Sequence, residues 1–210
     1  GLLSMTRHTG TFFDGLFPDA EDTGTLFNHE LLYNPNGTNG GTEGLKIGFP
    51  YNHNGGRYDL EDRGLDKDPY RWGFQIRSAR GRDDYSPLIA LNQAMELSGT
   101  DLEAALVDII DVDQWMRTFA MMSLNGTDDV YSRIWEHNFR YYVRPTDQKI
   151  IIFQWDLDRS FNLGTTSSVT PNRNSVRKIF AIPRYRRLFD GHLNDLIETT
   201  FNRTYTTSWA

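Results

Sequence analysis

The chain has 210 residues, which is long enough for one domain with a buried core, and its net charge is −6. This charge argues against a nucleic acid as partner, because polyanions are bound by basic surfaces. No cysteine occurs, so disulfides and thiolate metal sites are excluded. No apolar run approaches the ~20 residues that a membrane-spanning helix needs.

The first third of the chain is rich in turns and contains short strand candidates. Residues 1–25, where Phe residues are scattered among Gly, Asp and Thr, are predicted to be loop with at most a short helix or strand. Asn34–Gly44 is predicted to be a loop, because Gly, Asn and Thr dominate it. Leu26–Tyr33 is compatible with a strand or with one helical turn, and Leu45–Phe49 is a short apolar strand candidate.

A second stretch with strand character, Tyr70–Ile76, leads into a charged turn at Arg77–Asp84. The turn contains Arg77, Arg80 and Arg82, which would suit phosphate groups. Pairing with Asp83, Asp84 and the nearby acids is an equally good interpretation of these arginines.

Two helices are predicted next. In the first, Ser86 is the expected N-cap and Pro87 the first helical residue, and the helix stops before Ser98-Gly99. Its buried face is expected to hold Leu88, Leu91 and Met95. A second helix is predicted to start at a capping box, Thr100–Glu103, and to run to about Ile110.

A third helix is predicted from Asp111, an N-cap followed three residues later by Gln114, to Asn125-Gly126. One face of this helix is expected to lie in the core, because its apolar residues recur at helical spacing: Val112, Trp115, Phe119 and Met122. The helix therefore delivers the chain to the acidic turn that follows.

The acidic turn contains Asp128 and Asp129, and it is followed by His137 and Asn138. Phe139–Val143 alternates at period two and is predicted to be a strand, with Arg140 and Tyr142 on the face opposite Phe139. The next five residues, 144–148, have the composition of a turn.

Lys149–Trp155 is nearly continuously apolar, as expected of a buried strand, and it ends on Asp156-Leu157-Asp158. A hairpin is therefore predicted, with Asn138 where it begins and Asp156 where it ends.

This order suits phosphoryl transfer. Such a site needs a carboxylate that orients the attacking hydroxyl and accepts its proton, and it needs oxygen ligands for Mg²⁺. Protein kinases supply a catalytic-loop Asp, then an Asn, then an Asp beyond a hairpin. Here Asp129, Asn138 and Asp156 occur in that order. The alternative is that the acids are only turn residues and a solvated strand end. His137, beside an Asn at a strand start, is expected to be a structural hydrogen-bonding residue.

The chain after this hairpin is predicted to be a loop, 162–174, a short helix, 174–180, and a long helix from Pro183. The loop falls where kinases carry an activation segment, although a plain connector explains it equally well. The start of the long helix carries the basic residues Arg184, Arg186 and Arg187. Its apolar side is expected to comprise Tyr185, Leu188, Phe189, Leu193, Leu196, Ile197 and Thr200.

Three segments, GTDDVY, HNFRYYVRP and IIFQWDLDRSF, resemble the CotH kinase family, named for a spore-coat protein kinase. The resemblance covers roughly residues 26–200, and the HN and WDLD parts are its most specific. On these motifs the Asp of the turn falls on Asp129, the Asn on Asn138 and the first Asp of WDxD on Asp156. It places the Arg77–Asp84 segment close to where the nucleotide would lie.

The resemblance implies an α+β, atypical protein-kinase-like fold, with ATP and Mg²⁺ as cofactors and transfer to Ser or Thr of a protein substrate. Asp129 would be catalytic, Asn138 and Asp156 would bind the cofactors, and Asn138, Asp156 and Asp158 would be metal ligands. Residues 1–84 would be a partial N-terminal lobe with a hinge-like segment, and residues 85–210 a helical catalytic lobe around a two-stranded hairpin. Both ends look truncated, and an extracellular or cell-surface location is favoured.

The sequence departs from the kinase pattern in one respect. A kinase needs a Lys and a Gly-rich cover over the phosphates, and upstream of the hinge-like segment Lys46 is the one strand-like Lys. Alternatives to an active kinase are a pseudokinase, acting as a binding or surface-assembly module, and a metal-dependent hydrolase that uses the same acids.

Overall fold

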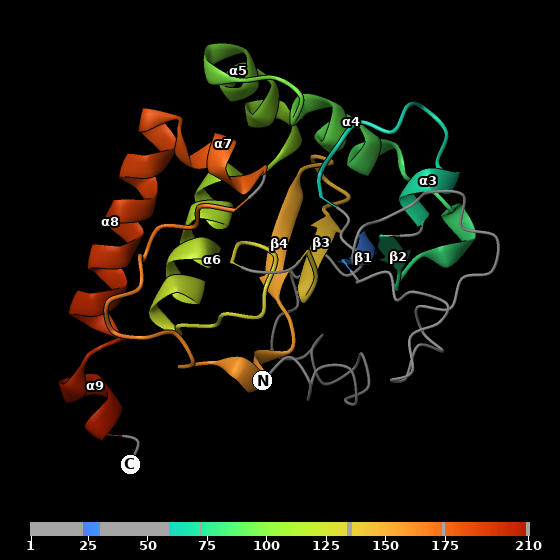
Figure 1. Cartoon of the computed structure of the whole chain (residues 1–210). Helices are drawn as coiled ribbons and strands as arrows, with labels where there is room; N and C mark the ends of the chain where they lie inside the picture. Colours follow the sequence, from blue (N-terminus) through green and yellow to red (C-terminus); the bar gives the residue numbers. More distant parts are fainter. Residues whose placement is uncertain (1–22, 30–58, 72, 134–135, 174, 209–210) are drawn as a thin grey trace.

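The computed structural model describes residues 23–29, 59–71, 73–133, 136–173 and 175–208 (Figure 1). The predicted strand Leu45–Phe49, with Lys46, and the predicted loop Asn34–Gly44 lie outside the described residues.

The described strands form one antiparallel sheet in the order β2-β1-β3-β4. The predicted strands are confirmed as β3 (Phe139–Val143) and β4 (Ile150–Gln154), which form a hairpin. β1 (Thr25–His29) pairs along the whole length of β3, and β2 (Phe74–Ile76) pairs with β1. The hairpin expected inside the helical lobe is therefore part of a larger sheet, because strands from before residue 84 pair with it.

The stretch Tyr70–Ile76 is not one strand. Its first part belongs to a helical turn, α3 (Asp68–Arg71), and β2 begins only at Phe74. The side chain of Asp66 accepts a hydrogen bond from the backbone N–H of Asp68, which supports the start of α3. A 3₁₀ turn, η1 (Arg80–Arg82), follows β2.

The three predicted central helices are confirmed as α4 (Ser86–Ala94), α5 (Gly99–Ile109) and α6 (Val112–Leu124). The start of α6 is as predicted, since the Asp111 side chain accepts a hydrogen bond from the Gln114 N–H. The start of α4 lies one residue before the predicted position, and that of α5 lies two residues before it. Ser86 lies inside α4, where Asp84 accepts its N–H, and α5 starts at Gly99 without a side-chain cap.

The C-terminal part is helical, with α7 (Val176–Phe180), α8 (Pro183–Thr199) and α9 (Arg203–Thr207), and a 3₁₀ turn, η2 (Leu157–Arg159), follows β4. On α8, Tyr185 and Phe189 are buried as expected, whereas Ile197 is 47% exposed and Thr200 is also exposed. The apolar side of this helix therefore ends near Leu196, because the last turn of α8 extends beyond the core.

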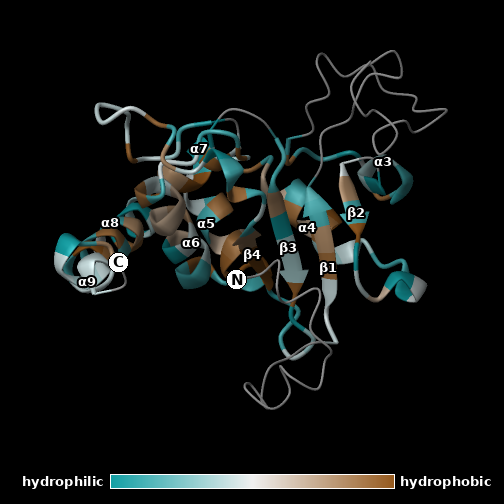
Figure 2. Ribbon diagram, turned by 90° about the horizontal axis from the view of Figure 1, so that it is seen from below, coloured by the Kyte–Doolittle hydropathy of each residue, from teal (hydrophilic) through white to brown (hydrophobic). Residues whose placement is uncertain are grey.

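The elements lie in a row from α8 through α6 to β4, β3, β1 and β2, as Figures 1 and 2 both show. α6 packs against both α8 and β4. Side chains of α6 supply hydrogen bonds to backbone groups on the outer edge of β4. The Gln114 side-chain amide donates to Ile152 O and accepts from Ile152 N–H, and the Trp115 indole donates to Ile150 O.

The core lies between α6 and the inner face of the sheet. Trp115, Phe119 and Met122 are buried as predicted, together with Phe139 and Tyr141 of β3. Within the described residues, no helix has the length and apolarity that crossing a membrane requires. The core thus fixes the end of α6 and the ends of the β3–β4 hairpin relative to one another.

Candidate active site

The candidate site begins where α6 ends. Gly126, with a φ of 58°, lets the chain leave the helix in a left-handed conformation that favours glycine. The chain that leaves the hairpin returns to this point, because Phe161 N–H donates to Asn125 O at 2.6 Å and Asn162 and Leu163 donate to Gly126 O. The acidic turn and the segment after β4 are thus tied together by backbone hydrogen bonds.

Asp129 is partly buried and held from two sides. Its Oδ1 lies 2.7 Å from Nε2 of His137. Its backbone carbonyl accepts a hydrogen bond from the side-chain amide of Asn138 at 2.9 Å. A further backbone hydrogen bond, Tyr131 N–H to His137 O, closes the turn. The position of the carboxylate is therefore determined by its neighbours.

Asn138 connects Asp129 to the other strand of the hairpin. It has a φ of 55° and is nearly buried, and its carbonyl accepts a hydrogen bond from Trp155 N–H at 3.2 Å. The next residue, Asp156, is exposed and also has a left-handed backbone, with a φ of 56°. Such values are uncommon for residues other than glycine and often occur at functional sites. The hairpin end therefore brings Asn138 and Asp156 onto neighbouring strand ends, with Asp129 bonded to the first.

Asp128, beside Asp129, has a different environment. Its carboxylate forms a two-fold interaction with Arg159 at 2.8 Å and accepts a hydrogen bond from Asn162. The hydrogen bond from Arg159 is the main cause that lowers the pKa of Asp128 to about 2, and Asn162 adds to it against the effect of burial. Asp128 thus stays ionised, and its carboxylate stabilises the turn through Arg159 and Asn162. Its backbone carbonyl accepts a hydrogen bond from Val130 N–H.

The donor atoms suit a hard cation. The side-chain nitrogen of Asn138 donates to Asp129, and its side-chain oxygen accepts no hydrogen bond from the described residues. Asp156 and Asp158 are exposed carboxylates. In the described part of the chain, no group of three His, Asp or Glu side chains is arranged to hold a metal. Mg²⁺ usually takes one or two carboxylates and completes its shell with phosphates and water, so these residues fit a cation that arrives with a nucleotide.

A cation–π contact between Arg140 and Trp155 stiffens the same end of the hairpin. The Arg140 guanidinium lies 3.2 Å from the centre of the Trp155 ring, and its Nε donates to the side chain of Asn28 on β1. Alternation along β3 predicted the face on which Arg140 lies, but Asn28 is far away in the sequence.

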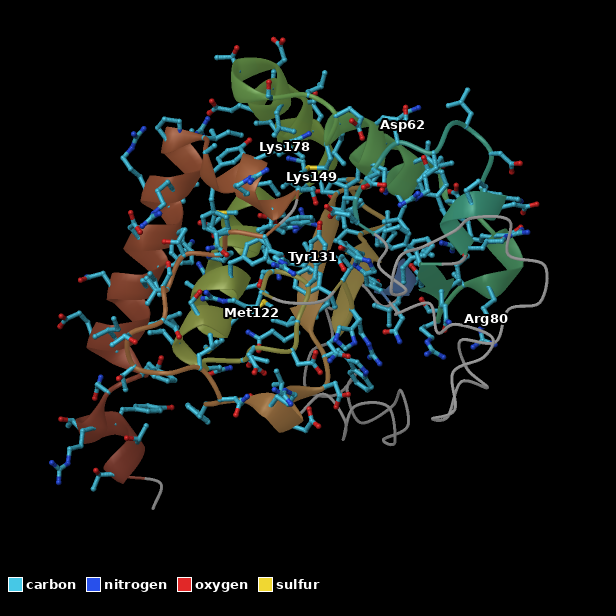
Figure 3. All side chains as sticks on the ribbon, in the orientation of Figure 1. Asp62, Arg80, Met122, Tyr131, Lys149 and Lys178 are labelled. Atoms are coloured by element: carbon cyan, nitrogen blue, oxygen red, sulfur yellow. The ribbon has the colours of Figure 1, made fainter. Side chains whose placement is uncertain are left out.

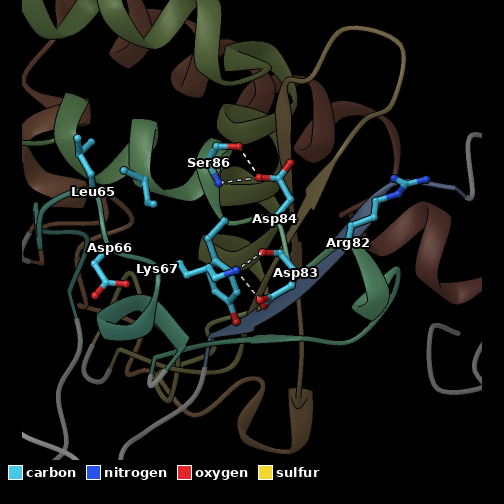
Figure 4. A pocket seen from close by; sticks show the side chains of 9 residues that line it. Leu65, Asp66, Lys67, Arg82, Asp83, Asp84 and Ser86 are labelled. Carbon is cyan, nitrogen blue, oxygen red and sulfur yellow. Dashed lines mark hydrogen bonds and ion pairs between the residues drawn. The ribbon is translucent and has the colours of Figure 1, made fainter.

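Among the described residues, Asp83 and Asp84 have partners other than the arginines of the Arg77–Asp84 turn. Asp83 forms its ion pairs with Lys67, at 2.6 Å, and with Arg71, and Asp84 bonds to Ser86. Arg82 donates instead to the carbonyl of Thr23. Figure 4 shows Lys67, Asp83, Asp84 and Ser86 around an open depression, with Arg82 directed away from Asp83 and Asp84. Asp129, Asn138 and Asp156 do not line this depression.

The comparisons with known proteins bear on this arrangement. No curated protein matches the chain. A family model described as CotH kinase protein matches residues 51–209, which is most of the chain and includes the acidic turn, the hairpin and the helices α4 to α8. The chain therefore belongs to the CotH kinase protein family.

Proposed function

We propose that this protein transfers the γ-phosphoryl group of ATP, with Mg²⁺, to a Ser or Thr hydroxyl of a protein substrate. The observation that carries the proposal is the chain of contacts from Asp129 to Asn138 and from Asn138 to Trp155, which sets Asp156 at the adjacent strand end. Family membership supports a kinase-like activity.

Asp129 is the proposed base. His137 engages Oδ1, and Oδ2 accepts no hydrogen bond from the described residues, so this oxygen is the one that would meet the substrate hydroxyl. The hydroxyl oxygen forms a bond to the γ-phosphorus while the bond between that phosphorus and the bridging oxygen of ADP breaks. The hydroxyl proton passes to Asp129, and ADP leaves with the electron pair of the broken bond.

Asn138 and Asp156 are the proposed metal ligands, with Asp158 as a further carboxylate on η2. A bound Mg²⁺ would neutralise the charge that develops on the phosphate oxygens. These residues would hold the cation at the hairpin end, where the left-handed backbone of Asp156 turns the chain away from β4. Arg159 of η2 forms an ion pair with Asp128, so we assign it to stabilising the turn rather than to binding phosphate.

A transfer assay tests the proposal. The full-length protein is incubated with Mg²⁺, ATP labelled at the γ-phosphate and a Ser/Thr-containing protein. Label on protein is the expected result. Label released only as free phosphate would identify a hydrolase instead, and nucleotide binding without turnover would identify a pseudokinase.

A further inference from the structure

A partly buried polar cluster, in which Tyr131 and Ser175 are buried and Asp59 is half-buried, joins three segments that are distant in the sequence. The Tyr131 hydroxyl donates to Oδ1 of Asp59 at 2.8 Å, and the backbone N–H of Ser175 donates to Oδ2 of Asp59 at 3.1 Å. The Ser175 hydroxyl also contacts both Asp59 and Tyr131. The carboxylate of Asp59 therefore receives hydrogen bonds from the other two residues of this cluster.

Tyr131 connects the cluster to the acidic turn. It lies two residues after Asp129, its side chain is fully buried, and its backbone N–H donates to His137 O. Its ring contacts those of His29 and Phe139, with centroids 5.0 and 5.6 Å away. Figure 3 shows Tyr131 at the centre of the molecule, between α6 and the sheet. A displacement of Tyr131 would therefore move the turn that carries Asp129.

Ser175 connects the cluster to the loop at residues 162–173. This loop starts at the acidic turn, where Asn162 bonds to Gly126 and Asp128. In its middle, Arg133 donates to the carbonyls of Ser168 and Val169. Its far end passes into α7 through Ser175. The loop is thus attached to residues 125–133 at its start and middle, and at its end through Asp59.

We propose that Asp59 is a positioning residue for phosphoryl transfer, which sets the loop at residues 162–173 against the turn that carries Asp129. This inference rests on the proposed function. A carboxylate placed among buried groups costs free energy unless its oxygens accept hydrogen bonds. Here the Asp59 carboxylate accepts hydrogen bonds from Tyr131, beside the acidic turn, and from Ser175, at the end of the loop. Reactions of positioned groups are sensitive to displacements of about 1 Å, so the cluster acts on turnover through Asp129.

The Tyr131 hydroxyl is a dependable donor in this cluster. Burial, followed by the negative charge of Asp59, raises the pKa of Tyr131 well above its usual value. The phenol therefore keeps its proton, and replacing it with phenylalanine removes the donor with little change of shape.

The chain supplies a matched control for this replacement. Tyr185 on α8 is also buried, and its hydroxyl makes a hydrogen bond to the carbonyl of Glu103 on α5, away from the acidic turn. Tyr131→Phe and Tyr185→Phe each remove one buried hydroxyl. We expect Tyr131→Phe to lower kcat about 10-fold or more with the KM for ATP within about two-fold, and Tyr185→Phe to leave both constants unchanged. Asp59→Asn should lower kcat in the same way as Tyr131→Phe.

Equal kcat values for the two phenylalanine variants would overturn the proposal, because a merely structural tyrosine affects the Tm alone. If Tyr131→Phe does not fold, Ser175→Ala is compared with Tyr185→Phe by the same constants, and an unchanged kcat overturns the proposal. If the parent protein transfers no phosphate, the proposed function fails, and hydrogen exchange then tests the cluster. Tyr131→Phe should speed amide exchange in both residues 125–133 and residues 162–173, and exchange that changes in neither segment overturns it.

Discussion

The Nε2 atom of His137 lies 2.7 Å from Oδ1 of Asp129, and both side chains are largely shielded from solvent. One oxygen of the proposed base is thus engaged, and its carboxylate has a fixed orientation. The sequence predicts that His137 makes a structural hydrogen bond, and its partner in the structure is Asp129, the proposed base.

His137→Ala should lower phosphate transfer about 10-fold, less than loss of Asp129 itself, because the carboxylate remains but loses the contact that orients it. Initial rates at saturating ATP measure the effect. His192→Ala is the control, since His192 makes a similar contact with Asp113 at 2.8 Å on the surface. Equal rates for His137→Ala and the parent would show that the contact does not orient the base.

Asp156→Asn should weaken the binding of Mg·ATP, because it removes a charged oxygen from a cation that loses its water reluctantly. Binding is measured by titration of ATP with and without Mg²⁺, and the loss should occur only with the metal. Asp195→Asn, an exposed change on α8, is the control. A variant at Asp156 that binds Mg·ATP as tightly as the parent would exclude this residue as a ligand.

Phe119→Ala should destabilise the fold by ~3–5 kcal/mol, as expected for removing a large core side chain. The Phe119 ring contacts Phe180 at 5.5 Å, Phe139 at 6.0 Å and Trp115 at 6.1 Å between centroids. Urea denaturation measures the change in the free energy of unfolding. Leu97→Ala, at a position that is 40% exposed, should change it far less, and similar losses for both variants would contradict the core assigned here.

Asp128→Asn should lower the Tm by several degrees at pH 7, because it breaks the charged interaction with Arg159. The pKa of Asp128 is lowered to about 2 in the folded protein, against roughly 3.9 for an unperturbed Asp. The stabilisation is therefore complete above the unfolded value and is lost as the pH falls through about 2. Thermal unfolding of both proteins from pH 7 to pH 2 should show their Tm values converge, and a constant difference would assign the loss to another cause.

Local patterns predicted much of the fold. Alternation in Phe139–Val143, the apolar run of β4 and the cap at Asp111 identified the hairpin and α6, because each depends on neighbours in the sequence. The prediction of a strand at Tyr70 is wrong, because Tyr70 lies in the helical turn α3 with its side chain buried. A buried aromatic residue fits a strand and a helical turn equally well, so aromatic content alone does not distinguish them.

The contacts of the candidate site depend on residues that are far apart in the sequence. Motif order indicated Asp129, Asn138 and Asp156, but it gave no sign of the pairing of Asp128 with Arg159 or of the contact between Asp59 and Tyr131. Such pairings arise only when the sheet and α6 are assembled. The addition of β1 and β2 to the hairpin could not be predicted for the same reason.

The central claim is that Asp129, rather than Asp128, receives the proton of the substrate hydroxyl. The measurement that tests it most directly is phosphate transfer by Asp129→Asn and Asp128→Asn in the full-length protein, with Mg·ATP affinity measured in parallel. Asp129→Asn should reduce transfer by ~10²-fold or more while the affinity stays within a few-fold, and Asp128→Asn should lose less activity and more stability. Abolished transfer in Asp128→Asn together with normal transfer in Asp129→Asn would contradict the assignment.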